Sequence, residues 1–268
     1  MSQSAKDAAT ARRPKSTLYL ESRYRKLRRG LPQTIFYCPK CKGDRRRRVG
    51  CKESVQELIS RRLVPAMQGK LGKFHGAGRE DIDVLMLGKG RPFVFEVVGA
   101  RNPNIDLEAI RLEIQERADG AIELAPFERV ERRRVVYWKE THFDKTYRAE
   151  VALNDTPDPE RLAAVRAFAG GIIQRTPQRV AHRRADLERE RKLKVLDLQP
   201  RDDGALDLKV LCQHGTYVKE WISGDEERTT PSLAKLLGVG CTCRVLDVEE
   251  ILMPEIEGGP PADWRDNC

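Results

Sequence analysis

The sequence lacks any apolar run long enough to cross a membrane, so it predicts no membrane-spanning helix. Its first residues, MSQSAKDAATARRPKS, are polar and small, and they lack the apolar stretch of a secretion signal. The seven cysteines are an odd number without regular disulfide spacing, which in the cytosol indicates thiols or metal ligands rather than bridges. We also find no internal repeat. These absences predict a cytoplasmic protein that makes no contact with a membrane.

The charge balance suggests a polyanionic partner. The 268 residues allow one large domain or two small ones, and the 40% of hydrophobic residues is ordinary for a globular core. Lysine and arginine outnumber the acids by 50 to 41, and the net charge of +9 goes with a pI near 9.3. A basic cytosolic surface without any such partner would have the same totals. The local arrangement of the arginines is therefore more informative than the sum.

Hydrophobic periodicity predicts an α+β fold with mostly local, antiparallel strand pairing. Ser54 is expected to cap the first helix, with Glu57 three residues further on. Helices are expected over 54–68, 105–118, 158–169, 216–222 and 232–237, and the third of these is expected to end at Gly170-Gly171. Strands are expected over 130–140, 145–154 and 242–253, with hairpins over 83–99, turning at Gly88-Lys89-Gly90, and 193–211, turning at Asp202-Asp203-Gly204.

The densest group of chemically useful residues is FHGAGREDIDVLMLGKGRPFVFE, residues 74–96. Its glycines let a backbone approach a ligand closely, and an arginine beside a carboxylate can bind phosphate. Asp81 or Asp83 could act alone on a nucleic-acid sugar. Alternatively, Asp83 and Glu96 could bind Mg²⁺ as in a nuclease, although Val98 stands where such nucleases usually have lysine. An acidic surface turn would have the same composition.

Two further segments are candidates for RNA contact. QRTPQRVAHRRADLERER, residues 174–191, is rich in arginine, which suits phosphates, although a solvated face of ion pairs would look alike. HGTYVKEWISGDEERTTP, residues 214–231, places Tyr217 and Lys219 in the first turn of a short helix, where an aromatic ring and a cation could hold a flipped base. Tyr217 and Trp221 could equally form the core face of that helix.

Cys38 and Cys41 have the spacing of half a zinc knuckle, which leaves a structural zinc ion open. Cys51, Cys241 and Cys243 could add ligands only if the fold brought them near. A single CxxC pair without a second pair is equally compatible with free thiols.

Six ordered blocks of the sequence resemble the tRNA pseudouridine synthase family of archaea and eukaryotes that modifies uridines 54 and 55 of the T arm. They are LYLESRYRKLRRGLPQT, GREDIDVLMLGKGRPFVFE, DKTYRAEV, RTPQRVAHRR, HGTYVKEWISGD and RTTPSL, and they are spread over about residues 17 to 250.

The resemblance implies the pseudouridine synthase fold, with a mixed, mostly antiparallel sheet, flanking helices and an RNA-binding cleft. It places the catalytic aspartate at Asp81, the active-site tyrosine at Tyr217 and the basic partner of the aspartate at Lys219, and leaves Asp83 to begin a strand. It implies no cofactor for catalysis. Residues expected to bind the RNA substrate are Arg79, Arg91, Tyr147, Arg179, Arg183, Arg184 and Arg228.

The resemblance also predicts the domain organisation: a disordered tail at 1–16, one catalytic domain at 17–253 and a C-terminal tail at 254–268. Family members usually carry an N-terminal RNA-binding domain with paired CxxC motifs, and this sequence has only a short segment before Leu18. We therefore expect either a separate RNA-binding partner or compensation by the basic stretches 23–29 and 45–48, in a monomeric protein. The alternatives to the enzyme are a non-catalytic RNA-binding protein that keeps the fold and the metal-dependent nuclease.

Overall fold

The computed structural model of the chain describes residues 16–35, 53–182 and 184–253. They form two compact units. Unit 1 comprises Met1–Tyr24, Gly30–Ile82 and Arg91–Glu140, and unit 2 comprises Arg25–Arg29, Asp83–Gly90 and Thr141–Cys268. The stretch expected to be one catalytic domain, residues 17–253, includes residues of both units. Residues 1–15 of the expected N-terminal tail, the expected C-terminal tail, Cys38, Cys41 and the four arginines at 45–48 lie outside the described residues, whereas Ser16 begins β1.

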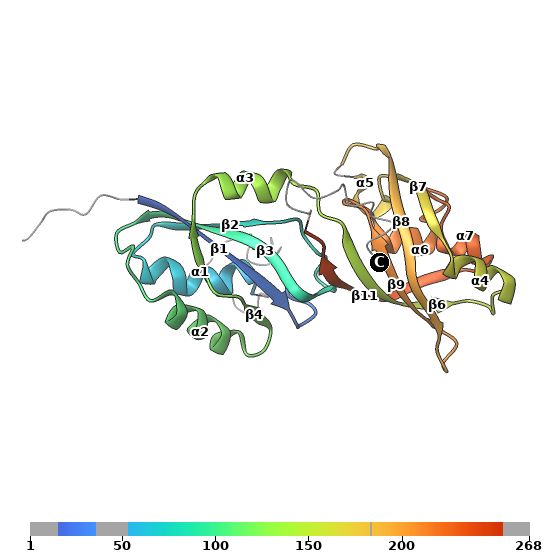
Figure 1. The fold of residues 1–268 in the computed structure, drawn as a ribbon, viewed down its shortest axis with the longest axis horizontal. Coiled ribbons are helices and arrows are strands. Elements are labelled where there is room, and N and C mark those ends of the chain that lie inside the picture. The colour runs from blue at the N-terminus through green and yellow to red at the C-terminus, as the bar shows by residue number, and fades with distance from the viewer. Residues whose placement is uncertain (1–15, 36–52, 183, 254–268) are drawn as a thin grey trace, which may run out of the picture. The chain divides into compact units, whose positions relative to one another are not determined.

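Unit 1 combines a small sheet with three described helices. Strand β2 pairs antiparallel with β3, β5 pairs antiparallel with β1, and β1 also neighbours β3 and β4. Helices α1 and α2 pack against each other, and α3 contacts β2 (Figure 1). Residues 25–26 of β1 and 85–90 of β3 are counted with unit 2. The elements are β1 (Ser16–Lys26), α1 (Val55–Ala66), β2 (Leu71–Gly76), β3 (Leu85–Ala100), α2 (Leu107–Ala118), β4 (Ile122–Leu124), β5 (Glu128–Val130) and α3 (Arg133–Glu140).

Unit 2 is built on strands in the order β10-β7-β8-β9-β6-β11, each antiparallel to its neighbour. Strand β11 also pairs in parallel with the first residues of β3, with Asp247 opposite Leu85. Helix α6 packs on β11 and α7, and α4 packs on β8 and α7 (Figure 1). The elements are β6 (Lys145–Leu153), α4 (Pro159–Arg166), β7 (Ala169–Arg175), α5 (Gln178–Ala181), β8 (Glu188–Pro200), β9 (Leu206–Cys212), α6 (Val218–Ser223), β10 (Thr229–Thr230), α7 (Leu233–Leu237) and β11 (Cys241–Ile251).

The expected α+β class with a mixed, mostly antiparallel sheet is therefore confirmed, and local signals explain most of the elements. The Ser54 hydroxyl accepts the Glu57 N–H at 3.2 Å and the Glu57 carboxylate accepts the Ser54 N–H at 3.2 Å, so the expected capping box is present. The side chains of Asp158 and Ser232 also cap their helices, α4 and α7, by accepting backbone N–H groups of the first turn. The expected hairpin between β8 and β9 and the short helix after Thr216 are also present.

The expected hairpin turn at Gly88-Lys89-Gly90 is wrong, because β3 runs through it without reversing. Gly88 has a φ of 52° and Gly90 a φ of 78°, so the glycines bend the strand rather than turn it. A Cβ on Gly88 would collide with the carbonyl oxygen of Glu249 on β11. The hairpin partner of β3 is instead β2, which precedes it.

Two other expectations are wrong. Much of the segment expected as a strand over 130–140 forms helix α3, whose buried residues Val135 and Trp138 lie three apart on one face. Its β-branched residues suggested a strand, but burial on one helical face decides the outcome. Gly170 and Gly171 lie in β7 instead of ending a helix, and α4 ends with Ala167 as its C-cap.

Candidate functional site

The turn that carries Asp81 rests on a buried polar cluster in unit 1, which we call the Glu80 network: Tyr24, Gln33, Glu80 and Arg91. The Tyr24 hydroxyl lies 2.9 Å from both carboxylate oxygens of Glu80, and Arg91 Nε donates to Glu80 at 2.7 Å. Gln33 donates to the Tyr24 oxygen at 2.8 Å and to the Gly78 carbonyl at 3.0 Å. Arg91 also donates to the Ala77 carbonyl at 2.7 Å. The network thus holds the backbone that leads to Asp81 at two carbonyls.

Burial decides the role of Arg91, which was expected to hold a phosphate. Its side chain is 1% exposed and that of Glu80 is 0% exposed, so the guanidinium supports the turn and does not face solvent in this structure. Burial, and then the charge of Glu80, raise the pKa of Tyr24 well above its usual value, so the phenol stays protonated. Arg79 is exposed and Asp81 is partly buried.

Asp83 lies in a turn of unit 2, and the side chains of Arg29 and Asp247 make hydrogen bonds to the backbone of this turn. Arg29 donates to the Asp83 carbonyl at 2.7 Å and to the Asp247 carboxylate at 2.8 Å. The other oxygen of Asp247 accepts the Leu85 N–H at 3.1 Å. Asp83 therefore precedes β3 rather than beginning it, and its carboxylate is left to make a separate contact.

That contact is with Lys219. Its ammonium donates to both carboxylate oxygens of Asp83, at 2.7 and 3.0 Å. Burial by itself would raise the pKa of Asp83, but the hydrogen bond and charge of Lys219, with a smaller effect of the buried Lys26, outweigh it and lower the pKa. Asp83 is therefore a stable anion, and the sequence had assigned Lys219 to Asp81 without foreseeing this pair.

Tyr217 is the N-cap residue of α6, and two neighbours contact it. Arg184 Nη1 donates to its hydroxyl at 3.0 Å. The side-chain amide of Gln174 accepts the Tyr217 N–H at 2.9 Å and donates to the Tyr217 carbonyl at 3.0 Å. Trp221, one helical turn on, is fully buried, so the core position belongs to Trp221 while Tyr217 is only partly buried.

The other expected RNA-binding residues have different surroundings. Arg179 donates to Glu220 at 2.5 Å and remains 44% exposed, so part of its guanidinium faces solvent. Arg228 is 17% exposed and donates twice to the Thr176 carbonyl and once to Asp186, which makes it mainly a support for the loop after β7. Tyr147 is partly buried on β6 between β9 and β11. Arg183 lies outside the described residues.

The structure therefore brings Asp83, Lys219, Tyr217 and Arg184 into unit 2, whereas Asp81, Arg79 and Arg91 belong to unit 1. Sequence reasoning missed Gln174, Arg29 and Asp247. A signal existed for Gln174, because Ile172 and Gln174 are both buried on alternate positions of β7, and a polar residue at an apolar position needs a partner.

The expected metal ligands can be compared with the structure only in part, because Cys38, Cys41 and Cys51 lie outside the described residues. Over residues 16–35, 53–182 and 184–253, no three His, Cys, Asp or Glu residues cluster as metal ligands would. Glu96, offered for Mg²⁺ binding, already pairs with Lys73 at 2.8 Å and His75 at 2.9 Å. Burial raises the pKa of Cys241 and of Cys243 to about 11, so both thiols are protonated at neutral pH.

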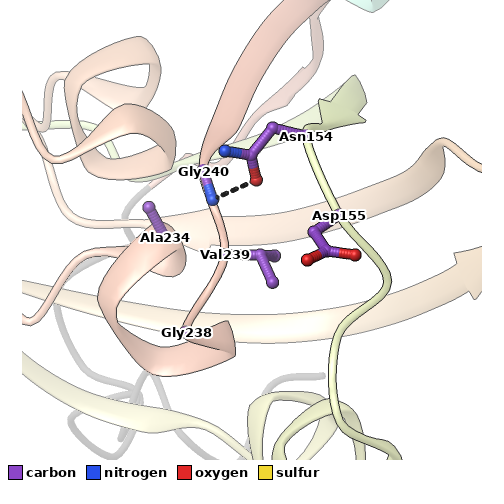
Figure 2. Close-up of a pocket in the computed structure, with 6 residues that line it drawn as sticks. All are labelled: Asn154, Asp155, Ala234, Gly238, Val239 and Gly240. Atoms are coloured by element: carbon purple, nitrogen blue, oxygen red, sulfur yellow. Dashed lines mark hydrogen bonds between the residues drawn. The ribbon is translucent and has the colours of Figure 1, made fainter.

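One hollow opens in unit 2 away from these residues (Figure 2). Asn154 Oδ1 accepts the Gly240 N–H there at 2.7 Å, and Asp155 is its charged side chain. No helix among the described residues is long and apolar enough to cross a membrane.

Comparison with known proteins agrees with the expected family. Curated relatives named "tRNA pseudouridine synthase Pus10" from Methanocaldococcus jannaschii and Methanothrix thermoacetophila are each 43% identical, over 246 and 240 residues. Each alignment covers 87% of this chain and 53% of the relative, so the chain spans about half the length of these archaeal relatives. A solved Cbf5-Nop10-Gar1 complex overlaps 74% of this chain and 45% of its own at 20% identity, with a TM-score of 0.41, too low to assign a fold.

A family described as "Pus10, C-terminal" matches residues 19–252. That range contains the six blocks on which the resemblance was recognised, apart from Leu18, and it includes residues of both compact units. The chain therefore belongs to the Pus10 C-terminal family.

Proposed function

We propose that the chain is an isomerase that converts uridine to pseudouridine in tRNA, at position 55 of the T arm with position 54 as a second target. The observation that carries the proposal is the 43% identity to proteins named tRNA pseudouridine synthase Pus10 over most of the chain. The basic composition and the exposed arginines at positions 79, 179 and 184 support an RNA substrate.

The proposed chemistry assigns the reacting carboxylate to Asp81. The target uridine leaves the base stack, which makes its sugar carbon accessible. Asp81 then attacks the sugar or removes its 2′ proton, and the bond between the sugar and N1 breaks. The uracil rotates, C5 forms the new bond to the same sugar carbon, C5 loses its proton and N1 gains one. No atom is lost from the RNA, so the reaction needs no cofactor.

Tyr217 acts on the base, and Lys219 acts on the turn that contains Asp83. Tyr217 stacks on the uracil and assists removal of the C5 proton, and Arg184 donates a hydrogen bond to its hydroxyl. The bond from Lys219 to Asp83 supports a revised role for the lysine: it anchors the turn that follows Asp81 in the chain and places a positive charge there. Asp83 is thereby the second candidate for the reacting carboxylate.

The first experiment uses purified protein, unmodified tRNA transcript and EDTA, with pseudouridine mapped by carbodiimide-blocked primer extension. Wild type and Asp83→Asn are expected to give a new stop in the T arm, the variant more weakly. Asp81→Asn is expected to bind tRNA nearly as well as wild type and to give no stop. A stop that survives in Asp81→Asn but is lost in Asp83→Asn moves the catalytic assignment to Asp83.

The same assay separates the alternatives. Tight tRNA binding without any stop indicates a non-catalytic RNA-binding protein or dependence on a separate RNA-binding partner. Strand cleavage that requires Mg²⁺ indicates a nuclease, and EDTA abolishes it while leaving an isomerase active. The expected monomer and a cytoplasmic location are checked by sedimentation and by cell fractionation.

A further inference from the structure

Tyr217 occupies a backbone position that the helix itself does not stabilise. Its φ of −94° and ψ of 94° are extended, and its own side chain makes no capping hydrogen bond to α6. Its carbonyl accepts the Trp221 N–H at 3.0 Å as the first bond of the helix. Helix ends leave backbone groups that need partners from outside the helix. The orientation of the Tyr217 ring therefore depends on what holds its peptide groups.

Gln174 contacts both the N–H and the carbonyl of Tyr217 with one side chain. Its Oε1 accepts the Tyr217 N–H at 2.9 Å and its Nε2 donates to the Tyr217 carbonyl at 3.0 Å, so the amide and the residue backbone form a closed ring. The amide assignment follows from the partners, because the flipped amide would put donor against donor and acceptor against acceptor. Replacing either the oxygen or the nitrogen of the Gln174 amide breaks one of the two hydrogen bonds.

The Gln174 side chain is itself fixed. It is 2% exposed, and its Nε2 also reaches Thr229 Oγ1 at 3.3 Å on β10, the strand that pairs with β7 at this position. A buried amide that satisfies its hydrogen bonds within a sheet has little freedom to move. Through Gln174, the strands β7 and β10 fix the position of the Tyr217 backbone, and the loop that precedes Tyr217 does not.

The same short segment makes two further polar contacts in unit 2. Two residues after Tyr217, Lys219 bonds to Asp83 at 2.7 Å, and the Tyr217 hydroxyl accepts from Arg184 at 3.0 Å. We infer that Gln174 is a positioning residue, which fixes the Tyr217 backbone so that the ring and Lys219 keep their directions. We call the two hydrogen bonds between the Gln174 amide and the Tyr217 backbone the clamp. The inference rests on the proposed function of Tyr217 in the isomerisation, but the clamp itself can be measured without activity.

The test compares Gln174→Met, which keeps the length of the side chain and removes both hydrogen bonds, with Ser232→Ala. Ser232 is buried and caps α7 in the same unit by accepting the Lys235 N–H, so its loss destabilises unit 2 without removing a hydrogen bond of Gln174. Gln174→Met should lower the single-turnover rate of pseudouridine formation at least tenfold and leave the tRNA dissociation constant within twofold. Ser232→Ala should leave both unchanged.

A second readout needs no activity. Amide hydrogen exchange of the segment 216–222 should become at least tenfold faster in Gln174→Met and stay as in wild type in Ser232→Ala. If the wild-type protein forms no pseudouridine but the segment 216–222 still exchanges faster in Gln174→Met, the clamp is upheld and the proposed function is refuted. Unchanged exchange, a rate within twofold of wild type, or an equal loss of rate in Ser232→Ala overturns the inference.

Gln174→Glu covers the case in which the methionine variant does not fold. Its ionised carboxylate places an oxygen against the Tyr217 carbonyl, whereas the protonated acid has the donor and the acceptor of the amide. The ratio of variant to wild-type rate should therefore rise at least fivefold between pH 8 and pH 6. Groups that titrate in both proteins, including any near Arg189, the neighbour of Gln174 on β8, affect both rates and cancel in the ratio. A ratio that does not change with pH therefore contradicts the clamp.

Discussion

Removing the Glu80 carboxylate is expected to destabilise unit 1 more than removing any exposed acid from it. Glu80 lies at 0% side-chain exposure with Arg91 at 1%, and the carboxylate accepts from both Arg91 and Tyr24. In Glu80→Ala the Arg91 guanidinium stays buried and keeps its bond to the Ala77 carbonyl, but it has lost the carboxylate that compensates its charge. Breaking one partner of a buried ion pair costs about 3–5 kcal/mol.

The matched control is Glu113→Ala in the same unit. Glu113 pairs with Arg62 at 3.8 Å and is 55% exposed, so its removal should change the free energy of unfolding by only about 0–1 kcal/mol. Urea denaturation followed by circular dichroism measures both variants. With an m-value of about 3 kcal/mol per M, the Glu80→Ala midpoint should fall by ~1–1.7 M while that of Glu113→Ala barely moves.

A double variant separates charge from packing. Glu80→Met combined with Arg91→Met removes both charges and keeps apolar volume, so it should be more stable than Glu80→Ala, because no uncompensated charge remains. If Glu80→Ala costs no more than Glu113→Ala, or if the double variant is less stable than the single one, the ion pair is not what holds the Asp81 turn.

Two pH-dependent effects are expected as well. Because the folded-state pKa of Tyr24 is raised, wild-type stability should fall as the pH rises above about 10, where only the unfolded chain loses the proton, and Tyr24→Phe should show a shallower fall in alkaline urea titrations. Because the folded-state pKa of Asp83 is lowered by Lys219, the pair stabilises the protein above about pH 4 and its contribution is lost as the pH falls; the stability difference between wild type and Lys219→Met should vanish in acid, and NMR titration should find the Asp83 pKa higher in the variant. A stability difference that persists in acid would refute the second effect.

Sequence reasoning failed at features that depend on distant partners. The two glycines at 88 and 90 were interpreted as a hairpin turn, but the close approach of β11 is what requires glycine at 88. The pairing of Lys219 with Asp83 joins residues 136 positions apart, and nothing in the local pattern distinguishes Asp83 from Asp81 as its partner. The burial of Arg91 likewise follows from Tyr24 and Glu80, which meet only in the folded unit.

The sequence by itself determined the α+β class, the capped helices α1, α4 and α7, the β8–β9 hairpin and the family, because periodicity, caps, turns and ordered motifs are local properties of the chain. Tertiary structure alone decided which charges are buried, which carboxylate binds Lys219 and that Gln174 holds Tyr217. Ion pairing and burial depend on which segments of a folded chain come together, and that information is spread over the whole sequence rather than contained in any one motif.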